Sequence, residues 1–261
     1  MNEFRDDKGF VKTEISAHGI AQIIFGHPSH NAFPAQLLKD LAATIDEVGK
    51  NKEVRVIVLK SNGEKTYCAG ASFDELIKID SESAGKIFFS GFAYVINAIR
   101  LCKKIVVGQV QGKAIGGGVG LAAACDYCFA TDHASIRLSE LGINIGPFVI
   151  APAVQRKIGL AAFTELSLNP DQWRNAVWAK EKGLYQETFT TIEEMEKAVN
   201  IFCKKFTDYS LEALKALKNI LWENTSHWDG LLLERAAISG KLVMTPEAKE
   251  SLENLTKSRN Q

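Results

Sequence analysis

The sequence lacks an excess of charge of either sign. Lys and Arg together number 31, as do Asp and Glu, so the formal net charge is zero. Proteins that bind nucleic acid or anionic membranes through long-range attraction carry a basic excess. The balanced charge argues against both nucleic acid and anionic membranes as partners, although it does not exclude a local basic patch.

Long apolar runs are also missing. No uninterrupted apolar segment reaches the length that crosses a bilayer. The opening residues MNEFRDDKGF do not show the basic-then-apolar pattern of a signal peptide. We therefore expect a cytoplasmic protein with no membrane partner.

The sequence offers few groups for metal or nucleophile chemistry. Its five cysteines are odd in number, and Cys125-x-x-Cys128 has no second pair or histidine cluster to complete a metal site. Cys125 and Cys128 are more simply two small buried apolar residues, and we expect no metal. A phosphate loop of the G-x-x-x-x-G-K-[ST] type is absent, and Ser139 lacks a nucleophile-elbow pattern.

What the sequence does contain is alternation of strands and helices. The 261 residues are enough for one domain, or for one domain with a small appendage. The predicted elements are a hairpin over 11–28, helices over 34–51 and 84–102, and strands over 54–61, 104–112, 127–132 and 134–138. This alternation predicts an α/β core with parallel strands. Four helical patterns follow residue 191 and predict a C-terminal helical appendage.

Glycines are concentrated where a helix is expected to begin. The segment GKAIGGGVGLAAACD has Gly116, Gly117 and Gly118 at the helix entrance and Gly120 on its first turn. The first N–H groups of a helix have no acceptor inside the helix, and the helix dipole makes that end partly positive. The run therefore suits stabilisation of negative charge close to the backbone. A tight turn in which glycine only relieves crowding is an equal alternative on spacing alone.

A second glycine turn, KTYCAGASFDEL, spans residues 65–76 and follows another predicted strand. Two strand–turn–helix units could direct two backbone N–H groups at one oxygen. That arrangement is an oxyanion hole, which stabilises an enolate as well as a tetrahedral intermediate.

Three segments in order, YCAGAS, GKAIGGGVGLAAACD and ASIRLSELGINIGP, resemble the crotonase superfamily, also called the enoyl-CoA hydratase/isomerase family. The resemblance implies a crotonase-type spiral of β-β-α units over 1–190 and a helical trimerisation region over 191–261. It further implies a homotrimer or dimer of trimers that acts on acyl-CoA, with CoA as part of the substrate and no separate cofactor.

The resemblance also assigns roles to residues. The N–H groups of Ala71 and Gly117 would hold the thioester oxygen, and the neighbouring glycines would let the thioester come close. Glu140, which taken alone is an ordinary turn glutamate, would be the acid/base. The substrate-binding set implied for the CoA ester is Ala32, Ala69, Gly70, Gly116, Gly120 and Lys65, the last as a partner for a phosphate.

One position departs from the best-known hydratases, in which a glutamate stands where this sequence has Gly120. The site thus has one carboxylate, Glu140, and resembles most closely the methylglutaconyl-CoA hydratase-like subgroup of leucine degradation. Hydration of a 2-enoyl-CoA, of straight fatty or branched acyl type, is the predicted reaction. Lys113 and Arg137 are candidate partners for a carboxylated acyl group, although each is more simply a surface or structural charge.

Three alternatives stay open at this point. A Δ3,Δ2-enoyl-CoA isomerase needs only the single glutamate. Decarboxylation of a carboxylated acyl thioester would use the same oxyanion hole. A non-catalytic binding member of the fold, with RNA as a conceivable ligand, is a different class of protein.

Overall fold

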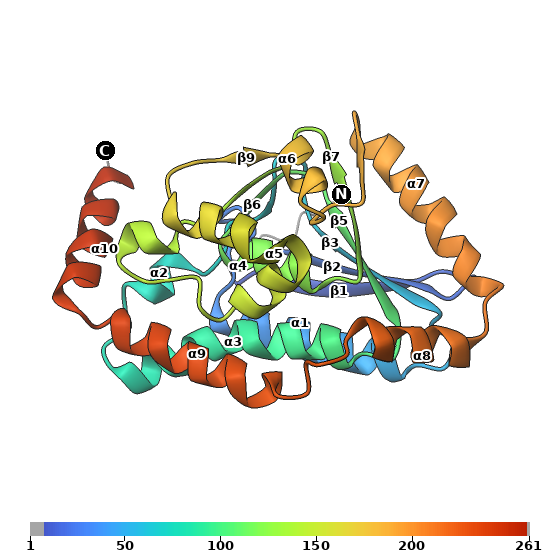
Figure 1. Cartoon of the computed structure of the whole chain (residues 1–261), viewed down its shortest axis with the longest axis horizontal. Coiled ribbons are helices and arrows are strands. Elements are labelled where there is room, and N and C mark those ends of the chain that lie inside the picture. Colours follow the sequence, from blue (N-terminus) through green and yellow to red (C-terminus); the bar gives the residue numbers. More distant parts are fainter. Residues whose placement is uncertain (1–7, 260–261) are drawn as a thin grey trace.

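The computed structural model describes residues 8–259 and consists of two β-sheets surrounded by helices (Figure 1). Residues 1–7, on which part of the signal-peptide argument rests, lie outside the described residues. The larger sheet contains, in spatial order, β1 (Phe10–Ile15), β2 (Ile20–Gly26), β3 (Val56–Ser61), β5 (Ile105–Val110), β7 (Tyr127–Thr131) and β10 (Glu187–Phe189). Only β1 and β2 in it are antiparallel.

The smaller sheet contains β4 (Thr66–Cys68), β6 (Lys113–Ile115), β8 (Ser135–Arg137) and β9 (Arg174–Asn175) in that order. The first three strands run parallel, and β9 is antiparallel to β8. Because β4, β6 and β8 are parallel, their carboxyl ends meet at one edge of the sheet. All of these strands are short, and neither β4 nor β6 was predicted from the sequence.

The predicted hairpin, helices and longer strands are confirmed, with ends that shift by one to three residues. The helices before residue 191 are α1 (Ala35–Lys50), α2 (Phe73–Leu76), α3 (Glu82–Leu101), α4 (Gly117–Ala124), α5 (Ala151–Leu168) and α6 (Ala176–Glu181), with a 3-10 turn η1 (Glu140–Ile143). Helix α1 forms because its apolar residues recur at helical spacing, and all of these residues are buried. Strands β3 and β5 are apolar and buried along most of their length, as strands covered on both faces are.

The C-terminal helices are confirmed, and they share the core of the preceding chain. They are α7 (Ile192–Lys204), α8 (Leu211–Leu221), α9 (Trp228–Leu242) and α10 (Pro246–Arg259), with a 3-10 turn η2 (Lys205–Thr207) between the first two. Helix α9 lies along α3 (Figure 1), and a Cβ added to Gly85 would lie 2.7 Å from the Cα of Gly240. Helix α7 covers the larger sheet through Met195 and Val199. The change of pattern at residue 191 therefore does not separate two hydrophobic cores.

Helix α8 is fixed to the sheet by a buried charged group. The carboxylate of Asp126 accepts hydrogen bonds from Lys218 Nζ at 2.5 Å, Trp222 Nε1 at 2.7 Å and the Val106 N–H at 2.8 Å. The side chains of Asp126 and Lys218 are each 3% exposed. This network joins the start of β7 to helix α8 across the interior.

The five cysteines are buried as free thiols, and for Cys125 and Cys128 this agrees with the prediction that they are small buried apolar residues. Within residues 8–259, no helix is long and apolar enough to cross a membrane.

Candidate active site

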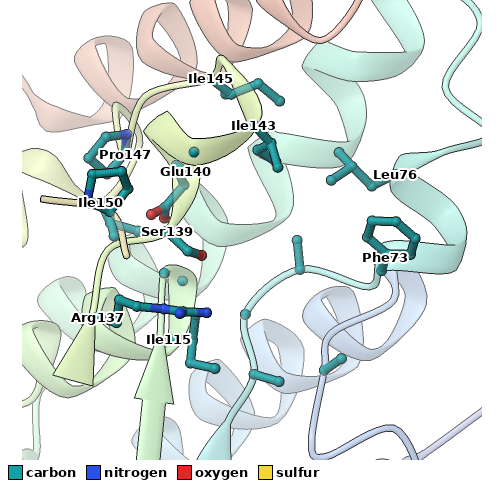
Figure 2. Close-up of a pocket in the computed structure, with 18 of the residues that line it drawn as sticks. Phe73, Leu76, Ile115, Arg137, Ser139, Glu140, Ile143, Ile145, Pro147 and Ile150 are labelled. Atoms are coloured by element: carbon teal, nitrogen blue, oxygen red, sulfur yellow. The ribbon is translucent and has the colours of Figure 1, made fainter. Parts of the chain in front are cut away.

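A cavity of about 720 Å³ lies at the carboxyl ends of the smaller sheet's parallel strands. Strand β4 leads into Gly70 and Ala71, β6 into Gly116 and Gly117, and β8 into the turn that carries Glu140. Segments far apart in the sequence thus contribute to one wall because the sheet brings three strand ends together. Figure 2 shows Glu140 and Arg137 on this wall, opposite Phe73 and Leu76.

Two backbone N–H groups on this wall have no acceptor among residues 8–259. No hydrogen bond from the N–H of Ala71 or of Gly117 is made to any described residue. Gly117 is the first residue of α4, where helix geometry leaves the N–H free. The two turns are adjacent, since a Cβ added to Gly70 would lie 3.6 Å from the Gly117 nitrogen. These donors are available to a ligand oxygen in the cavity.

The carboxylate of Glu140 lies directly beside this pair of turns. A Cβ added to Gly116 would be 2.7 Å from Glu140 Oε1, and Gly116 has a φ of 51°, a conformation that side-chain-bearing residues rarely adopt. The Gly116 N–H donates to the Arg137 carbonyl at 2.9 Å, which holds the glycine turn against β8. Glycine at 116 is therefore required for the carboxylate to reach this position.

Burial changes the acidity of Glu140. Its Oε2 atom is buried and has no hydrogen-bond partner. Loss of solvation raises the pKa of Glu140 to about 7, while its own backbone N–H and the positive charge of Arg137 act in the opposite direction. A carboxyl group with this pKa can accept and return a proton near neutral pH.

The pKa of about 7 predicts the pH dependence of catalysis. If Glu140 must be ionised in the free enzyme to accept a proton, kcat/KM is at its plateau above pH 7 and falls about tenfold per pH unit below it. Measurement of kcat/KM from about pH 5 to 9 tests this. A profile that is flat down to pH 5 would exclude a catalytic Glu140 with a raised pKa.

The structure explains the departure at Gly120. A Cβ at this position would lie 2.3 Å from Ile150 Cγ2, so the side-chain direction of residue 120 is occupied by Ile150. Ile150 itself lines the cavity and gives this part of the wall an apolar surface. The other acids that line the cavity, Asp74 and Asp171, are exposed. Glu140 is thus the one lining acid with a buried oxygen among the described residues.

Most of the expected binding residues line the cavity, and two do not. Together with Glu140, Ala71 and Gly117, the lining includes Ala32, Ala69, Gly70 and Gly116. Gly120 is buried behind Ile150, and the exposed Lys65 precedes β4 outside the lining. The structure therefore gives neither Gly120 nor Lys65 direct contact with the cavity.

The surroundings of the glycine run favour the alternative in which glycine relieves crowding. The places where Cβ atoms of residues 117 and 118 would lie are filled by protein. A Cβ on Gly117 would lie 2.1 Å from the Phe92 ring, and one on Gly118 would lie 2.7 Å from the Cys68 carbonyl oxygen. The glycines let α4 sit close to α3 and β4.

Sequence reasoning missed most of the apolar wall. Its members come from separate elements and include Phe73, Leu76, Phe89, Ile143, Ile145 and Leu255. Trp173, just before β9, also lines the cavity. Hydrophobic spacing marks such residues only as core, so no sequence signal distinguishes a cavity wall from packed interior.

The fold is that of crotonase proteins. A solved structure of an enoyl-CoA hydratase from Bacillus halodurans aligns with a TM-score of 0.87 over 94% of this chain and 99% of that one, at 22% sequence identity. Residues 15–257 match the sequence model of the family described as enoyl-CoA hydratase/isomerase, and the chain belongs to this family.

Two relatives illustrate the range of similarity. A probable enoyl-CoA hydratase of Bacillus subtilis (strain 168) is 25% identical over 92% of this chain and 93% of its own length. The mitochondrial methylglutaconyl-CoA hydratase of Mus musculus is 36% identical over 45% of this chain and 37% of its own length. Family membership supports a lyase or isomerase that acts on an acyl-CoA substrate.

Proposed function

We propose that this protein hydrates a 2-enoyl-CoA thioester, with Glu140 as its only acid/base residue. The observation that carries the proposal is the position of the buried Glu140 carboxylate, which lies against Gly116 next to the free N–H of Gly117. A hydratase needs a proton acceptor and an oxyanion hole in contact with the same conjugated thioester.

In the proposed reaction, the thioester oxygen accepts hydrogen bonds from Ala71 and Gly117. Glu140 takes a proton from water as the water oxygen bonds to the β carbon, and the electrons of the double bond move to the thioester oxygen. The two N–H groups stabilise this enolate. Glu140 then returns its proton to the α carbon, which gives a 3-hydroxyacyl-CoA and restores the ionised carboxylate.

The single carboxylate also supports a second candidate, isomerisation of a 3-enoyl-CoA. Glu140 would remove a proton from the α carbon and return it to the γ carbon through the same enolate. The apolar Ile150 surface beside the site lacks a second group that could position water, and this observation favours the isomerase. Hydration stays our first proposal because one carboxylate can both activate the water and deliver its proton.

Purified protein supplied separately with a 2-enoyl-CoA and a 3-enoyl-CoA distinguishes the two reactions. Hydration removes the absorbance of the conjugated enoyl thioester from the first substrate and yields the 3-hydroxyacyl product. Isomerisation creates that absorbance from the second. Gain of absorbance from the 3-enoyl-CoA without hydration of the 2-enoyl-CoA would contradict our proposal.

We also propose the type of acyl group, the assembly and the role of CoA. The partial similarity to a methylglutaconyl-CoA hydratase supports a branched acyl group of that type. We expect a homotrimer or a dimer of trimers, and CoA only as part of the substrate. Light scattering of the purified protein would give the oligomeric state.

A further inference from the structure

Arg137 is a charged residue of the cavity wall that the proposed hydration does not use. It is the last residue of β8, three positions before Glu140. Its side chain lines the cavity and points into it (Figure 2), and its guanidinium lies 4.8 Å from the centre of the Trp173 ring. The antiparallel pairing of β8 with β9 places Trp173 beside Arg137.

The buried donor of Arg137 has no hydrogen-bonding partner in the part of the chain that the structure describes. The Nε atom is buried and unpartnered, and no Asp or Glu in the described part of the chain forms an ion pair with this residue. Other arginines have acceptors: Arg174 pairs with Glu165 at 2.8 Å, and Arg100 pairs with Asp229. A guanidinium stays charged in proteins, and leaving its donors unpaired in a cavity is costly.

A second cation lies against the same indole ring. Lys113 Nζ is 5.2 Å from the centre of the Trp173 ring, and Lys113 lines the cavity from β6, the strand paired with β8. Lys113 also forms no ion pair with a described residue. Two like charges held near one another repel, and an anion bound there would relieve the repulsion. The carboxyl of Glu140 also faces Arg137, whose positive charge lowers the pKa of this carboxyl against the larger effect of burial, but the two side chains form no ion pair.

We propose that Arg137, assisted by Lys113, binds a second carboxylate carried by the acyl group of the substrate. The inference rests on the proposed function and narrows it to CoA monothioesters of unsaturated dicarboxylic acids. The planar guanidinium matches a carboxylate with two parallel hydrogen bonds, and Trp173 holds it in place. Arg137 is then a specificity-determining residue, because a neutral acyl chain would leave its donors unpaired.

The test compares two substrates of equal length, the CoA monothioester of pent-2-enedioic acid and its ω-methyl ester. Wild-type protein should prefer the free acid. Arg137→Met should lower kcat/KM for the acid by about 10- to 100-fold, since hydrogen bonds between charged groups are the strong ones, and leave the ester nearly unchanged. Arg137→Lys should restore part of the loss. Arg174→Met, which removes a neighbouring arginine outside the cavity lining, serves as the control and should keep the preference.

A phosphate of CoA is the other anion that this pair of cations could bind. To distinguish the acyl carboxylate from a CoA phosphate, the same two acyl groups are tested as thioesters of N-acetylcysteamine, which carries no phosphate. Under our proposal, Arg137→Met weakens the acid in both thioester series. The proposal would be overturned if Arg137→Met lowered kcat/KM equally for the acid and the ester as CoA thioesters and did not lower it for the N-acetylcysteamine thioesters. A wild-type enzyme that does not distinguish acid from ester would also overturn it.

A binding measurement keeps this inference separate from the proposed reaction. Pentanedioyl-CoA and its ω-methyl ester are saturated and cannot be hydrated, so calorimetry gives their Kd values whether or not the protein is a hydratase. Tighter binding of the acid, lost in Arg137→Met, supports the carboxylate site even if no enoyl-CoA is hydrated. Equal Kd values for acid and ester would refute it while leaving the hydratase proposal intact.

Discussion

Replacement of Glu140 by Gln is expected to lower kcat by about 10²- to 10⁴-fold, the range that a positioned acid/base group contributes. Gln keeps the shape of the side chain beside Gly116 but cannot accept and return a proton. The N–H groups of Ala71 and Gly117 are untouched, so the Kd of an unreactive acyl-CoA should change little. Turnover at steady state and calorimetric binding measure the two quantities separately.

The matched control is Asp171→Asn, which changes an exposed carboxylate of the same cavity. It should keep kcat near the wild-type value. A wild-type kcat in Glu140→Gln would exclude the mechanism. Loss of acyl-CoA binding together with kcat would indicate a disturbed cavity instead of a missing base.

The same substitution has an expected effect on stability. The folded protein holds a proton on Glu140 up to a pKa of about 7, whereas an unfolded glutamate releases it near its ordinary value. The folded state thus binds more protons in this window, and wild-type stability falls as pH rises through it. Glu140→Gln does not show this loss, so the stability of the variant relative to wild type should increase from about pH 4.5 to about pH 7 in denaturant titrations and stay level above that pH.

Replacement of Asp126 by Asn is expected to lower the free energy of unfolding by about 3–5 kcal/mol. The change removes the negative charge that compensates Lys218, whose side chain is 3% exposed, and it turns an amide donor toward groups that are themselves donors. A buried ammonium without its counter-ion is the main cost. Chemical denaturation monitored by tryptophan fluorescence would measure the loss, since Trp222 belongs to the network.

A surface pair on the same helix supplies the control. Lys215 and Glu212 lie 3.8 Å apart with side chains 43% and 85% exposed, and Lys215→Ala should change stability by less than about 1 kcal/mol. Adding Lys218→Met to Asp126→Asn should recover part of the loss, because no unpaired charge then remains buried. If Asp126→Asn lowered the free energy of unfolding as little as Lys215→Ala does, the network would contribute little to stability.

The regular elements could be predicted because their signals are local. Leu37, Leu41 and Ile45 recur at helical spacing, and β3 and β5 are continuous apolar runs with a turn after or before them. Strands β4 and β6 could not be predicted in this way. They are three residues long, and they exist only because they pair with one another and with β8.

The active-site prediction shows the same division. Glu140 and the turns of Ala71 and Gly117 could be identified from short motifs in the right order, and the structure places them on one wall of the cavity. The sequence suggested Gly120 as a binding residue, because glycine there replaces a glutamate of related enzymes. Only the fold shows Ile150 packed over that position.

The sequence by itself determined the α/β class and the family resemblance, and it predicted a single acid/base carboxylate, because each depends on residue types at fixed spacing along the chain. The tertiary structure alone decided that Glu140 is desolvated, that Ile150 covers Gly120, and that Arg137 and Lys113 share one tryptophan ring without an ion pair to any described acid. These properties depend on neighbours from distant segments. Burial, electrostatic interaction and unpaired donors arise only when the chain folds.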